Sequence, residues 1–76
     1  MTRKQIEVLK MNVQIAVRAN ADNTTAIMAK IKEIDKFLVD AWELHLIADY
    51  NEVLKLQKEI GQAAMNELDK LQKEIA

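Results

Sequence analysis

The chain has 76 residues, of which 50% are hydrophobic and 30% are charged, with a net charge of −1 and neither proline nor cysteine. This length predicts one domain over residues 1–76, and the near-neutral charge argues against nucleic-acid binding, which needs clustered Lys and Arg facing phosphates. No apolar run reaches the about 18 residues of a membrane span, and no secretory signal is visible, so we expect a cytoplasmic protein without membrane contact.

The first predicted helix covers residues 3–19. Thr2 and Gln5 fit a capping box, in which the threonine oxygen accepts from an early backbone amide and the glutamine reaches back to the cap. The helix is expected to end before the polar cluster NADNTT at residues 20–25, because short polar side chains compete for backbone hydrogen bonds. Asn23 or Thr24 is the expected cap of the next helix.

The second predicted helix covers residues 24–48 and carries one apolar stripe with steps of three and four residues. This stripe places His45, the only histidine, in the core, where a hydrogen bond would satisfy it. A metal site is not expected, because Asp49 would be the only second ligand nearby. Trp42 lies on the same stripe, which favours a position in the core, and the role of an interface anchor stays open as its alternative. The stripe consists of Ile27, Ile31, Ile34, Leu38, Ala41, Trp42, His45 and Ala48.

The third predicted helix covers residues 50–75. Asp49 and Glu52 interrupt the apolar stripe of the preceding helix and fit a D-x-x-E capping pair. The sequence therefore predicts an all-α three-helix bundle that self-associates. Since neither proline nor glycine forces a break near Asp49, the alternative is a helical hairpin with one continuous helix over residues 24–76, which would have to dimerise to cover its free half.

Two similar segments lie within this last helix. NEVLKLQKEIG at residues 51–61 returns fifteen positions later as NELDKLQKEIA at residues 66–76. The apolar positions run from Val53 to Ile75 at about 3.75 residues per turn, which predicts a nearly straight helix rather than a left-handed coiled coil. The glutamates and lysines between them, including Glu59 and Glu67, are expected to form a solvated face.

The first predicted helix has more apolar surface than a small bundle can cover. One stripe holds Ile6, Val13 and Val17, and a second lies on the opposite side of the helix. A helix that is apolar on both faces is usually buried on both, so we expect the second stripe to contact a partner. The residues expected in this contact are Val8, Met11, Ile15, Phe37, Trp42 and Leu44.

The sequence offers no set of residues for catalysis. It lacks serine and cysteine, and its threonines are distant from His45 in sequence, so no nucleophile and base can be paired. We therefore expect a protein that is not an enzyme and has no cofactor or metal. The predicted function is a protein–protein interaction module that forms a homo-oligomer or docks on a larger protein. The alternative is a small regulator or inhibitor of bacterial or phage type that binds and blocks a specific protein.

Overall fold

The computed structural model describes residues 1–75 and contains three helices in that range: α1 (Arg3–Ala19), α2 (Thr24–Glu43) and α3 (Tyr50–Ile75). Every pair of helices is in contact. The predicted all-α three-helix bundle is confirmed, and the continuous helix over residues 24–76 is wrong, because the chain turns between α2 and α3. Ala76, the last residue of the second similar segment, lies outside the described residues.

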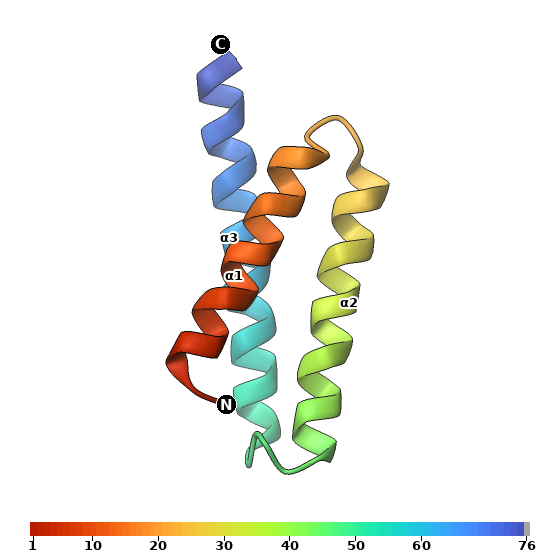
Figure 1. Ribbon diagram of the computed structural model, residues 1–76, viewed down its shortest axis with the longest axis vertical. Coiled ribbons are helices and arrows are strands. Elements are labelled where there is room, and N and C mark those ends of the chain that lie inside the picture. Colours follow the sequence, from red (N-terminus) through yellow and green to blue (C-terminus); the bar gives the residue numbers. More distant parts are fainter. Residues whose placement is uncertain (76) are drawn as a thin grey trace.

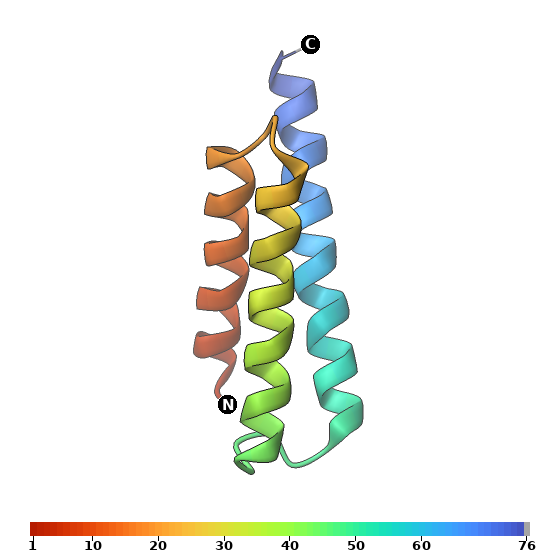
Figure 2. The same cartoon turned by 90° about the vertical axis from the view of Figure 1, so that its right-hand side faces the viewer.

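The helices form an elongated bundle of 44 × 21 × 17 Å. Helices α1 and α3 run in the same direction, and α2 runs antiparallel to both (Figure 1). The C-terminal turns of α3 project past the loop that joins α1 and α2 (Figure 2). Because α1 and α3 are parallel, residues at similar heights on the two helices differ by a constant number of positions.

Each helix begins at a cap of its own. At α1, Thr2 Oγ1 accepts from the Gln5 amide at 3.2 Å and Gln5 Oε1 accepts from the Thr2 amide at 2.8 Å, which is the predicted capping box. At α2, Asn23 Oδ1 accepts from the Ala26 amide at 3.1 Å. At α3, Asp49 Oδ1 accepts from the Asn51 amide at 2.9 Å. These bonds satisfy amides that an isolated helix start leaves free.

Helix α2 ends at Glu43, five residues before its predicted end at residue 48. The Leu46 amide donates to Ala41 O at 2.8 Å and the His45 amide donates to Trp42 O at 3.0 Å. This is the bonding pattern of a Schellman motif, in which the residue after the cap adopts a left-handed conformation. Here that residue is His45, with φ of 62°. The helix therefore stops without the glycine that usually marks this turn.

The core lies between the three helices and uses the predicted apolar stripes. Three residues of the predicted α2 stripe are exposed instead, namely Trp42, His45 and Ala48, the last two of which lie beyond the end of α2. His45 is exposed rather than in the core, because the turn takes it off the α2 stripe. Trp42 is 36% exposed at the surface of the bundle. It makes an edge-on contact with Tyr50, with ring centroids 4.9 Å apart. The buried hydrophobic residues are Ile6, Val13, Val17, Ile27, Ile34, Leu38, Ala41, Ile47, Val53, Leu56, Ile60, Ala63 and Ala64.

Gly61 lies inside α3, and a residue without a side chain would allow another helix to approach closely there. A Cβ atom added there would meet no atom within 4 Å, so no helix of the described chain approaches it closely. We therefore expect Gly61→Ala to stabilise the fold by about 0.5–1 kcal/mol, since glycine costs about that much inside a helix. Urea unfolding measures this change. Ala29→Gly, at an exposed position of α2, is the matched control and should destabilise by a similar amount.

Candidate protein interaction surface

The second apolar stripe of α1 faces away from the bundle. Val8, Met11 and Ile15 are each about half exposed, whereas Ile6 and Val13 on the opposite side are buried. No other helix of the described chain covers the three exposed side chains. The geometry thus leaves them free for another molecule, and the contact itself stays a prediction.

Phe37 of α2 extends this apolar surface. It is half exposed and lines, with Val8 and Leu9 of α1, a cavity of about 230 Å³. The structure therefore brings Val8 and Phe37 together, although they are 29 residues apart in sequence. We call Val8, Met11, Ile15 and Phe37 the outer α1 surface.

The other two predicted contact residues lie at a different place. Trp42 contacts Tyr50 at the start of α3, and Leu44 lies in the turn after α2. Neither lines the cavity beside Phe37. With Leu46 of the same turn, which is also exposed, they form a separate apolar surface. We call Trp42, Leu44, Leu46 and Tyr50 the α2–α3 corner.

Sequence reasoning missed two exposed apolar residues on α3. Leu54 and Met65 are each about half exposed. Together with Gly61 they follow a spacing of seven and four residues, which places all three on one side of the helix. The signal in the sequence that marks them is this second apolar stripe, which has helical spacing like the one on α1.

A row of ion pairs joins α1 to α3. Arg3 Nη2 and Lys10 Nζ lie 3.3 and 3.1 Å from Glu59 Oε1. Farther along, Arg18 bonds Glu67 through Nε and lies 3.3 Å from Glu74 through Nη2. Glu67 is only 8% exposed. The prediction that these glutamates belong to a solvated face is therefore wrong for Glu67, which is buried, and holds only in part for Glu59, which is partly exposed, because α1 packs over that side of α3.

The two similar segments supply equivalent members of this row. Glu59 and Glu74 occupy the same position of the two segments, fifteen residues apart, and Arg3 and Arg18 are also fifteen residues apart. Because α1 and α3 run in parallel, equal spacing on both lets each arginine meet its own glutamate.

Hydrogen bonds from Lys10 and then Arg3 lower the pKa of Glu59. That stabilisation is present above the unfolded pKa and is lost as pH falls through the lowered folded pKa.

Asp35 of α2 has a raised pKa, in contrast to the lowered pKa of Glu59. Its Oδ1 atom is buried and has no hydrogen-bond partner within the described residues, and desolvation raises its pKa. The ionised carboxylate therefore costs stability at neutral pH, and this cost disappears as pH falls through the raised folded pKa.

We expect Asp35→Asn, which removes the charge and keeps the shape, to be more stable than the wild type at pH 7. This advantage should shrink at acidic pH, because the wild-type carboxyl becomes protonated as the pH falls through its raised folded pKa. Urea midpoints at pH 7 and at acidic pH measure it. Asp69→Asn is the control, because Asp69 is exposed on α3. A less stable Asp35→Asn protein at pH 7 would mean that the carboxylate has a favourable partner.

The described residues show neither a metal centre nor a helix that could span a membrane. Within residues 1–75, no three or more His, Cys, Asp or Glu side chains are grouped so that they could hold a metal ion. No helix in this range is both long and apolar enough to cross a membrane. Comparisons with protein-family models, with curated proteins and with solved structures found no match.

Proposed function

We propose that the protein is a non-enzymatic helical interaction module that self-associates through the outer α1 surface. The observation that carries this proposal is the exposure of Val8, Met11 and Ile15 on one face of a helix whose other face is fully used in the core. Contiguous exposed apolar side chains on a soluble protein typically mark a contact with another molecule.

The total accessible surface supports an interface of ordinary size. The chain exposes 5382 Å², whereas a compact folded monomer of its 8.7 kDa mass would expose roughly 4,700 Å². The excess is comparable with the about 800 Å² that each partner buries in a standard protein interface. Part of this excess surface comes from the elongated shape of the bundle. Two chains that pair along their long axes would bury the excess surface and form a less elongated particle.

A second copy of the chain suits this surface because its centre is uncharged. Three of the cations of α1, Arg3, Lys10 and Arg18, bind glutamates of α3 instead. Two copies of α1 that pack antiparallel about a two-fold axis would place Met11 near its own symmetry mate. Such a self-complementary apolar contact meets no like-charge repulsion at its centre.

The test replaces the centre of the surface and compares a matched variant. Met11→Glu with Ile15→Glu should weaken self-association more than about 100-fold, because two unpaired carboxylates would have to be buried in each protomer. Light scattering measures the assembly, and circular dichroism should show unchanged helicity. The control is Met65→Glu, since Met65 is 55% exposed, like Met11 at 56%, but lies on α3.

Equal loss of assembly in the control, or a dimer that survives the double change, would overturn this proposal. A correctly folded wild-type monomer that is caught only by another protein would instead support the alternative, a regulator that blocks its partner.

A further inference from the structure

The charges of the chain are unevenly distributed around the α2–α3 corner. Residues 37–54 contain four carboxylates and neither lysine nor arginine, so the remainder of the chain carries a net charge of +3 against −4 here. All four carboxylates are exposed, and none forms a salt bridge within the described residues. By contrast, the α1–α3 row pairs its glutamates with cations. The four are Asp40, Glu43, Asp49 and Glu52.

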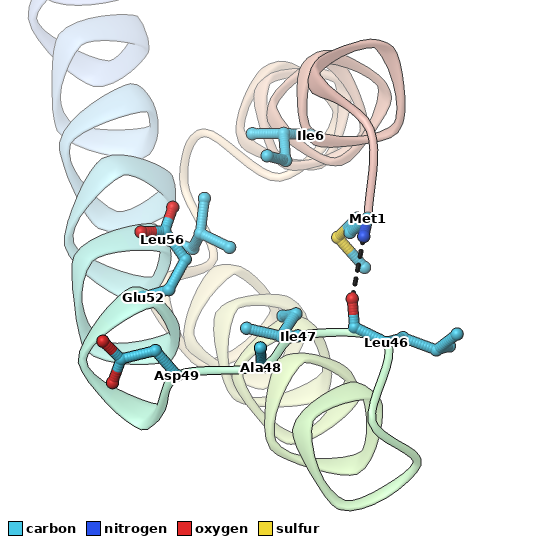
Figure 3. A pocket seen from close by; sticks show the side chains of 8 residues that line it. All are labelled: Met1, Ile6, Leu46, Ile47, Ala48, Asp49, Glu52 and Leu56. Carbon is cyan, nitrogen blue, oxygen red and sulfur yellow. Dashed lines mark hydrogen bonds between the residues drawn. The ribbon is translucent and has the colours of Figure 1, made fainter.

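Two strongly exposed apolar side chains lie between these carboxylates in the sequence. Leu44 is 70% exposed and Leu46 is 59% exposed, the two largest exposures among the large hydrophobic residues. Figure 3 shows the Leu46 side chain pointing away from the pocket beside Met1, whereas Ile47 points toward it. The α2–α3 corner is thus an apolar patch in a part of the chain whose four carboxylates form no salt bridge within the described residues.

The corner is held in place before any partner arrives. The Schellman bonds fix the backbone of His45 and Leu46. The Met1 ammonium donates to Leu46 O at 2.8 Å and brings one positive charge to the edge of the corner (Figure 3). Trp42 of α2 and Tyr50 of α3 connect the two ends of the turn through their edge-on contact. A fixed turn loses little conformational entropy on binding.

We propose that the α2–α3 corner binds a cationic amphipathic segment of another protein, with apolar side chains against Leu44 and Leu46 and Lys or Arg opposite the carboxylates of residues 37–54. Charge complementarity selects this occupant. Exposed leucines beside tryptophan and tyrosine also suit a membrane surface, but anionic lipid would repel the four carboxylates. A second copy of the corner would be repelled in the same way.

The experiment uses the full chain and a synthetic amphipathic peptide of leucine and lysine, about 15 residues long so that it can form a helix. Trp42 reports binding directly, because it is the only tryptophan and lies in the corner. We expect a saturable change in its fluorescence that weakens as salt is raised. A leucine and glutamate peptide of the same pattern is the matched probe and should not bind.

Two variants separate this proposal from self-association. Leu44→Ser with Leu46→Ser, both exposed and outside the helices, should weaken binding of the leucine and lysine peptide at least about tenfold. Met11→Glu with Ile15→Glu should leave it unchanged. The proposal is overturned if the leucine change has no effect on peptide binding, if both peptides bind equally, or if vesicles containing phosphatidylserine bind more tightly than the cationic peptide.

Discussion

Leu38→Ala is expected to destabilise the fold by about 2–5 kcal/mol, the usual range for removing a buried leucine. Leu38 lies in the middle of α2, is 0% exposed and is among the largest fully buried side chains. A protein of this size is typically stable by only about 4–11 kcal/mol, so the variant should lose a large part of its stability. Urea unfolding followed by circular dichroism measures the free energy difference.

The matched control for this prediction is Leu54→Ala, the same change at a position of α3 that is half exposed. Since its side chain loses less contact on truncation, the expected cost is below about 1 kcal/mol. Similar costs for the two variants would contradict the arrangement of α2 in the core. A large cost for Leu54→Ala alone would point to a partner that covers it.

Arg18→Met is expected to destabilise the fold more than any other single removal from the α1–α3 row. The substitution leaves the Glu67 carboxylate without its partner at a position where water reaches only 8% of the residue. An uncompensated buried charge is costly even when the intact pair contributes little. Arg3→Met is the comparison and should have a smaller effect, because Glu59 is more exposed and keeps Lys10. Urea unfolding at pH 7 ranks the two.

A double change separates the charge effect from lost packing. Glu67→Leu in the Arg18→Met background removes the orphaned carboxylate, so much of the lost stability should return. If the two changes were simply additive and destabilising, the buried contact between Arg18 and Glu67 would not be the source of the effect.

The helix bounds were predictable wherever a polar side chain caps the helix. Thr2 with Gln5 gave the start of α1 and Asp49 gave the start of α3, because both caps are formed by residues next to the helix in sequence. The end of α2 was missed because its Schellman turn is built on His45, and no residue type there marks a left-handed conformation. The burial expected for His45 failed for the same reason.

The candidate surface was only partly predictable. Periodicity showed that α1 has two apolar faces, and one of them had to point outward. Which residues of other helices would join it depends on how the helices are rotated, so the meeting of Val8 and Phe37 was visible only in the structure. The burial of Glu67 likewise depends on α1 lying parallel to α3, which spacing within one helix does not reveal.

Sedimentation equilibrium of the wild-type chain over a wide range of concentrations tests self-association through the outer α1 surface most directly. We expect an average mass that rises with concentration from the monomer value toward at least twice that value. A mass that stays at the monomer value up to high micromolar concentration, with the chain folded and no partner present, would contradict it.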